Sequence, residues 1–180
     1  MSEMITYTGK PFDPVHPKTE RIDIADIAHA LSLLCRGNGH LKTFYSVAQH
    51  SINCAREAEA RGYSRKVQLG CLLHDASEAY LSDVTRPVKA ELPQYLLLEA
   101  PVQEAIWNKW LESPLTEEER EQVFAIDDAL LAAELQQLMD PAIVETRPQL
   151  SSQPQLDFVA FSHYEGEFLA LFHKLRGCVL

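Results

Sequence analysis

The chain has 180 residues, of which 46% are hydrophobic and 23% are charged, so it is long enough for one globular domain with a substantial core. Acidic residues outnumber basic residues by 26 to 16. This balance argues against a nucleic-acid polymer as partner, because polynucleotide-binding faces neutralise phosphates with Lys and Arg. It still permits a small phosphorylated ligand, which one metal ion and two cationic side chains can bind locally.

The first part of the chain predicts an extended arm followed by three helices. Residues 1–20 contain three prolines and the alternating segment 5–8, which indicates a short strand or arm and then a loop. Apolar periodicity predicts helices over 23–34, where Gly37 and Gly39 follow the end, and over about 43–61. A third helix is expected to start near Ser64 and to carry His74, Asp75 and Glu78.

The second part also predicts helices. Pro93 and Pro101 suit helix starts, so residues 94–111 are expected to form two segments or one kinked helix. Thr116 precedes Glu119 by three residues, which is typical of a capping box opening a helix that reaches Met139. Residues 141–160 indicate irregular surface chain, and 162–176 a last amphipathic helix. Without a repeat or linker, we expect a single all-α domain over residues 1–180.

The cysteines and apolar segments bear on the compartment. Cys35, Cys54, Cys71 and Cys178 lack the paired spacing of zinc fingers or redox motifs. We interpret them as small buried residues in a reducing cytoplasm and not as a disulfide framework. The sequence contains no run of about 18 apolar residues, which is the length needed to cross a bilayer. Its first residues are not typical of an export signal. We therefore expect a cytoplasmic protein with no membrane partner.

His74 and Asp75 stand at the end of the apolar segment 67–73. Burying a neighbouring imidazole and carboxylate is costly without a partner, and a metal ion binds both groups. Glu78 follows at helical spacing and would project toward the same side. An ordinary exposed glutamate is the alternative interpretation of Glu78.

Two further positions could complete a metal site. His50 lies at the edge of the apolar face of the 43–61 helix, and antiparallel packing would bring it beside His74, although a structural histidine is the alternative. Asp127 and Asp128 interrupt an apolar helix, where an unpaired aspartate costs stability, although one of them could face solvent. His40 stands in a glycine-bearing loop, so we expect it to line the pocket.

The ordered set of His50, His74-Asp75 and Asp127 in an all-α chain resembles the HD-domain metal-dependent phosphohydrolases. It is most similar to small bacterial and phage or prophage 5′-deoxynucleotidases and to phage deoxynucleoside triphosphohydrolases, over residues 20–140 or so. The shared pattern consists of Cys35-Arg36, FYSVAQH (44–50), LHDASEAY (73–80), Asp83 and PVK (87–89).

The resemblance implies a role for each matching residue. His50, His74, Asp75 and Asp127 would ligate one divalent cation; Asp127 is preferred over Asp128 because its seven-residue step to Glu134 matches these relatives. Glu78 and Asp83 would orient the attacking water or move its proton. Arg36 and Lys89 would bind phosphate.

The chain departs from these relatives after Arg36. Several of them carry a bulky or aromatic residue there, whereas this chain has Gly37 and then Gly39. We therefore expect a more open pocket and do not carry over the base selectivity of the relatives. Asn38 and His40 could contact a base or ribose.

Mixed histidine and carboxylate ligation favours Mn²⁺, Co²⁺, Zn²⁺, Fe²⁺ or Ni²⁺ over Mg²⁺. The leading hypothesis is a metal-dependent nucleotide phosphohydrolase with 5′-deoxynucleoside monophosphates as substrates. The alternatives are a deoxynucleoside triphosphate triphosphohydrolase, which needs further cations such as Arg86 or Lys42, and a non-catalytic HD-fold regulatory or interaction protein. Apolar residues 96–98 and 178–180 suggest contacts within a homo-oligomer.

Overall fold

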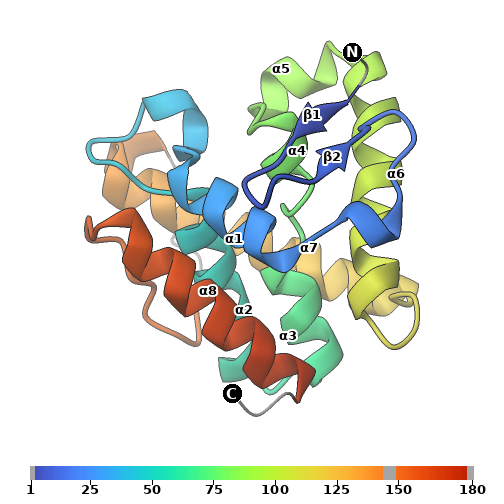
Figure 1. The fold of residues 1–180 in the computed structure, drawn as a ribbon. Helices are drawn as coiled ribbons and strands as arrows, with labels where there is room; N and C mark the ends of the chain where they lie inside the picture. Colours follow the sequence, from blue (N-terminus) through green and yellow to red (C-terminus); the bar gives the residue numbers. More distant parts are fainter. Residues whose placement is uncertain (1–2, 144–148, 178–180) are drawn as a thin grey trace.

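The computed structural model describes residues 3–143 and 149–177, and it confirms the all-α prediction (Figure 1). Eight α-helices lie in these residues: α1 (Ile24–Leu33), α2 (Val47–Ala60), α3 (Arg65–Leu72), α4 (Glu78–Leu81), α5 (Arg86–Ala90), α6 (Pro93–Trp110), α7 (Glu117–Leu138) and α8 (Phe161–Arg176). Short 3-10 turns cover Thr19–Arg21, Arg36–Gly39 and Pro141–Ile143. The predicted N-terminal strand is a two-residue β1 (Met4–Ile5), which pairs antiparallel with β2 (Pro11–Phe12).

Side-chain caps set the starts of α1 and α2. The Asp23 carboxylate accepts a hydrogen bond from the Ala25 backbone N–H, and α1 begins where the sequence predicts. The α2 helix begins four residues later than predicted, at Val47, with Ser46 as its N-cap. Ser46 also forms an antiparallel bridge with Cys35, and this pairing keeps the backbone extended just before the helix.

The predicted continuous helix from Ser64 through Glu78 is wrong. The α3 helix ends at Leu72, and a turn over residues 73–77 leads into the separate α4 helix. Gln103 from α6 donates to the Leu73 carbonyl at 2.7 Å and accepts from the Ser77 backbone N–H at 3.1 Å. The break therefore leaves these two backbone groups paired, and it places His74 and Asp75 in a turn.

The later helices follow the predicted pattern closely. Of the two alternatives for residues 94–111, the structure has one continuous helix, α6, which contains Pro101. The capping box at the start of α7 is present, with Thr116 and Glu119 bonding each other's backbone N–H. The α7 and α8 helices end within one residue of the predicted positions.

The α2 helix lies in the middle of the helical core, where it packs against α1, α3, α7 and α8 (Figure 1). The α8 helix lies across α1, α2 and α3. Leu97 of α6 is 74% exposed, whereas the tail residues 178–180 lie outside the described residues. No helix in the described part of the chain is both long and apolar enough to span a membrane.

A buried carboxylate fixes the segment after α7 to the central helix. Glu57 of α2 accepts hydrogen bonds from the backbone N–H groups of Ser151 and Ser152, from the Ser152 hydroxyl and from the Arg61 guanidinium, at 2.6–3.1 Å. Burial opposes the charge, but these donors hold the pKa of Glu57 below its ordinary value of 4.5. Its ionised form therefore stabilises the fold.

We expect Glu57→Gln to lower the free energy of unfolding by about 1–3 kcal/mol near neutral pH, because an amide N–H₂ would face backbone donors. Since the folded-state pKa is lowered, this stabilisation is present above pH 4.5 and decreases as the pH falls below it. Urea unfolding at several pH values measures the difference. Glu59→Gln, which removes an exposed pair with Lys174, is the control. A difference that does not change with pH would contradict the assignment.

Candidate metal centre

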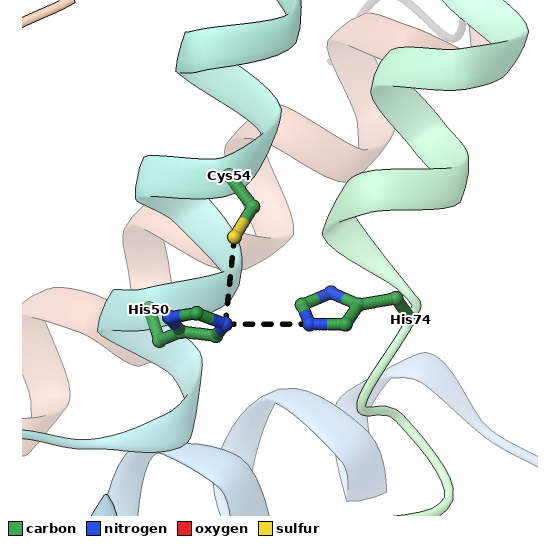
Figure 2. Close-up of side chains that lie close together, drawn as sticks. All are labelled: His50, Cys54 and His74. Atoms are coloured by element: carbon green, nitrogen blue, oxygen red, sulfur yellow. Dashed lines mark hydrogen bonds between the residues drawn. The ribbon is translucent and has the colours of Figure 1, made fainter. Parts of the chain in front are cut away.

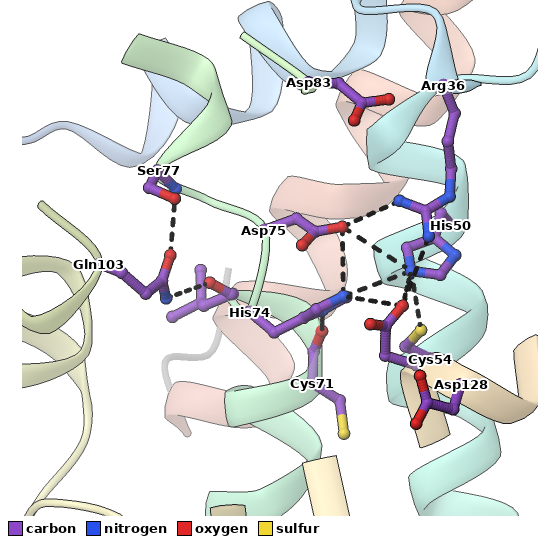
Figure 3. Close-up of polar contacts among 12 residues, drawn as sticks. Arg36, His50, Cys54, Cys71, His74, Asp75, Ser77, Asp83, Gln103 and Asp128 are labelled. Atoms are coloured by element: carbon purple, nitrogen blue, oxygen red, sulfur yellow. Dashed lines mark hydrogen bonds and ion pairs between the residues drawn. The ribbon is translucent and has the colours of Figure 1, made fainter. Parts of the chain in front are cut away.

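Four predicted ligand atoms, from His50, His74, Asp75 and Asp127, lie around one point between α2, the 73–77 turn and α7. Figure 3 labels His50, His74 and Asp75 of this set. His50 Nε2 is 3.3 Å from His74 Nε2, 3.1 Å from Asp127 Oδ1 and 3.8 Å from Asp75 Oδ2. His74 Nε2 is 3.2 Å from Asp75 Oδ2 and 3.6 Å from Asp127 Oδ1. Two ligands about 2.0–2.2 Å from a common ion stand roughly 2.8–3.8 Å apart when the angle between them at the ion is about 90–120°, so the observed separations suit one cation.

Both histidines are held with Nε2 facing this point. His50 Nδ1 lies 2.6 Å from a Glu134 carboxylate oxygen, and His74 Nδ1 lies 2.7 Å from the Cys71 carbonyl oxygen. These acceptors require the proton on Nδ1, which leaves the Nε2 lone pair for a ligand in the neutral tautomer. The sequence prediction for the two histidines did not include these acceptors.

The centre attracts positive charge. Burial lowers the histidine pKa values, but the surrounding carboxylates outweigh it, so that the pKa of His50 is raised and that of His74 is raised strongly. Burial also opposes ionisation of Asp75 and Asp127, but the histidines hold both carboxyl pKa values well below the usual range. Two anions facing two imidazoles form a site where a divalent cation can replace the imidazole protons.

Arg36 covers one side of the centre. Its guanidinium contacts Asp75 Oδ2 at 3.0 Å, Glu134 Oε2 at 3.1 Å and Asp127 Oδ1 at 3.4 Å, and the side chain is only 12% exposed. Burial lowers the pKa of Arg36, but the carboxylates, Glu134 first, raise it above its ordinary value. The predicted phosphate-binding residue therefore lies beside the ligands. Glu134 links it to His50, a link that the sequence prediction did not describe.

Cys54 is a neighbour that the sequence prediction missed. It lies one turn after His50 on α2, and its Sγ is 3.4 Å from His50 Nε2 (Figure 2). The spacing of four residues was the available signal, because such residues share a helix face. Burial raises the pKa of the Cys54 thiol strongly, so it keeps its proton. The buried group of His50, Cys54 and His74 could bind a metal ion.

Of the two predicted catalytic carboxylates, Glu78 lies near enough to both Asp75 and Asp83 for their negative charges to act on it. Glu78 is only 4% exposed, and its Oε2 has no hydrogen-bond partner among the described residues. Burial, followed by the charges of Asp75 and Asp83, raises the pKa of Glu78 well above its ordinary value. Asp83 Oδ2 accepts a hydrogen bond from the Gly37 backbone N–H at 2.9 Å, which fixes the loop that follows Arg36.

The remaining predicted binding residues do not contact the ligands. Lys89 pairs with Glu99 at 2.6 Å and stands 5.3 Å above the Tyr95 ring. Asn38 and His40 are exposed, and Asn38 has a positive φ of 53° between two glycines that also have positive φ. Their roles in binding substrate stay predictions.

The aspartate pair on α7 is resolved as one buried and one exposed residue. Asp127 faces the histidines, whereas Asp128 is 63% exposed and pairs with Arg86. The donor set of two imidazoles and two carboxylates fits a divalent transition ion better than an all-oxygen site for Mg²⁺. A helical fold with the buried group of His50, Cys54 and His74 is compatible with a metal-binding, HD-like fold.

Comparisons with known proteins identify relatives without an assigned activity. No protein-family model matches the chain. It is 38% identical over 110 residues to the uncharacterized protein YfdR of Escherichia coli K12, a match that covers 61% of this chain and 59% of that protein. It is 40% identical over 90 residues to the uncharacterized protein RCAP_rcc00048 of Rhodobacter capsulatus, covering 47% and 45%. The match thus spans about three fifths of the length of the Escherichia coli protein and under half of the length of the Rhodobacter capsulatus protein.

Proposed function

We propose that this protein is an HD-type, divalent-metal-dependent phosphohydrolase that releases phosphate from 5′-deoxynucleoside monophosphates. The observation that carries the proposal is the convergence of His50, His74, Asp75 and Asp127 on one point. These four residues would hold the cation. When bound, the cation would lower the pKa of a water and polarise a phosphoryl oxygen.

The environment of Glu78 favours a catalytic protein over a non-catalytic protein with the same fold. A buried carboxyl oxygen without a hydrogen-bond partner costs stability, and such costs are typical of functional sites. Its raised pKa favours the protonated form more than in an ordinary glutamate, which suits a group that exchanges a proton with the attacking water or the leaving oxygen. In a non-catalytic protein, a buried Glu78 carboxyl group with an unpaired oxygen would only lower stability.

The position of Arg36 supports the proposal that an anionic substrate binds beside the metal ligands. Its guanidinium already lies within 3.4 Å of two candidate ligands, so a phosphoryl group bound there would meet a fixed cation. Asp83, through the Gly37 backbone N–H, holds the loop from which Asn38 and His40 project to the surface. We assign these two side chains to the nucleoside part of the substrate.

We expect the chelated protein to be inactive, and Mn²⁺ or Co²⁺ to restore phosphate release from deoxynucleoside monophosphates. The measurement combines metal analysis with product analysis on panels of ribo- and deoxynucleoside mono- and triphosphates. Triphosphate as the product from deoxynucleoside triphosphates would replace the proposed substrate by the triphosphate alternative. Failure to bind a transition ion, together with no product from any substrate, would overturn both enzymatic proposals.

A further inference from the structure

Arg86 connects the two adjacent aspartates of α7. Its Nη2 lies 2.6 Å from Asp127 Oδ2, and its Nη1 lies 2.6 Å from Asp128 Oδ1. The planar guanidinium therefore spans both carboxylates with a separate nitrogen for each. Unlike the Arg36 side chain, the Arg86 side chain is 57% exposed, and its ion pairs in the described part of the chain are with Asp127 and Asp128.

The two oxygens of Asp127 face different partners. Oδ1 points toward His50 Nε2 and His74 Nε2, at 3.1 and 3.6 Å, whereas Oδ2 is occupied by Arg86. A carboxylate bound in this way offers a single oxygen to a cation. Without the guanidinium, the group could rotate about its last torsion and present either oxygen or both.

We infer that Arg86 is a positioning residue that keeps Asp127 as a one-oxygen ligand, and that Asp128 holds Arg86 in place for this task. The inference rests on the proposed metal centre. It gives a physical reason for the second aspartate on α7. The Asp128 side chain is exposed, and its ion pair with Arg86 links it to the candidate ligand Asp127. Partners of metal ligands typically change metal affinity or activity by about 10–100-fold when removed.

Two simpler explanations predict different results. An ordinary exposed ion pair contributes little, so its loss would leave metal binding unchanged. A cation acting only through its charge would repel a bound metal ion, so its loss would strengthen metal binding. Positioning alone predicts that removal of Arg86 weakens metal binding.

The test compares Arg86→Ala, Arg86→Lys and Asp128→Asn with wild type by Mn²⁺ titration calorimetry. We expect Arg86→Ala to weaken Mn²⁺ binding about tenfold. Arg86→Lys should weaken it similarly although it keeps the charge, because one ammonium cannot span both carboxylates. Asp128→Asn should weaken it less, and the Arg86→Ala/Asp128→Asn double variant should bind no more weakly than Arg86→Ala, since both changes act through one group.

The Co²⁺ absorption spectrum gives a second readout that does not depend on turnover. A change of Asp127 from one-oxygen to two-oxygen binding alters the coordination number and therefore the intensity of the visible bands. Arg120→Gln, which removes an arginine of α7 that pairs with Glu104, is the matched control and should leave both readouts unchanged.

The outcomes separate this inference from the proposed function. Unchanged or tighter Mn²⁺ binding in Arg86→Ala, with an unchanged Co²⁺ spectrum, would overturn the positioning role while the metal centre stands. Absence of Mn²⁺ and Co²⁺ binding by the wild type would overturn the centre itself. Because Arg86 is mostly exposed, thermal unfolding should show every variant folded.

Discussion

Asp75→Asn is expected to abolish both metal binding and phosphate release. Asp75 Oδ2 lies 3.2 Å from His74 Nε2 and 3.8 Å from His50 Nε2, and it supplies one of the two anionic ligands. A neutral amide of the same shape removes that charge. Since a bound cation contributes several kcal/mol to such reactions, turnover should fall by at least about 10³-fold.

The measurement is metal content together with phosphate release after reconstitution with Mn²⁺. Asp157→Asn, at an exposed position on the segment before α8, is the matched control and should keep wild-type metal content and rate. Asp75→Asn also removes the ion pair between Asp75 and Arg36, so thermal unfolding is recorded to show that this variant is folded. Stoichiometric metal and turnover within tenfold of wild type would mean that the centre lies elsewhere.

Local signals in the sequence were sufficient for most of the helices. The Thr116–Glu119 capping box depends on residues three positions apart and is present as predicted, and the helix predicted from residue 23 begins there, with the Asp23 carboxylate as its cap. The break after α3 could not be predicted in this way. It depends on Gln103, which lies 30 and 26 residues from the backbone groups of Leu73 and Ser77 that it satisfies.

The candidate metal centre likewise contains residues that the sequence could predict and residues that it could not. His50, His74, Asp75 and Asp127 could be predicted as candidates because imidazoles and carboxylates beside apolar residues need a partner, and the structure brings them together. The groups that orient them could not be predicted. Glu134 reaches His50 across 84 positions, and Arg86 reaches Asp127 across 41, so only the packing of α2, α5 and α7 reveals them.

Lys89 has a partner that the motif does not contain. The resemblance assigns it to phosphate, but its ammonium is paired with Glu99 on α6, ten residues later. The pairing arises because α5 and α6 pack against each other. This contact between two helices could not be predicted from the motif, and the role of Lys89 in binding phosphate stays a prediction.

Glu78→Gln is expected to lower kcat by about 10²–10⁴-fold, the usual contribution of general acid–base catalysis, while metal content stays at the wild-type level. The amide has the shape of the carboxyl group but cannot exchange a proton. Glu78 does not contact the candidate ligand atoms by any described hydrogen bond or ion pair, so the Mn²⁺ affinity should change far less than the rate.

Stability should move in the opposite direction from activity. Because burial and the charges of Asp75 and Asp83 raise the pKa of Glu78, its ionised form is disfavoured in the folded protein, and a neutral amide relieves that cost. We therefore expect a midpoint of thermal unfolding equal to or above that of wild type. Glu91→Gln, at an exposed position between α5 and α6, is the control. A fully active Glu78→Gln variant would show that the proton moves through another group, whereas a folded, metal-loaded and inactive one separates proton transfer from metal binding.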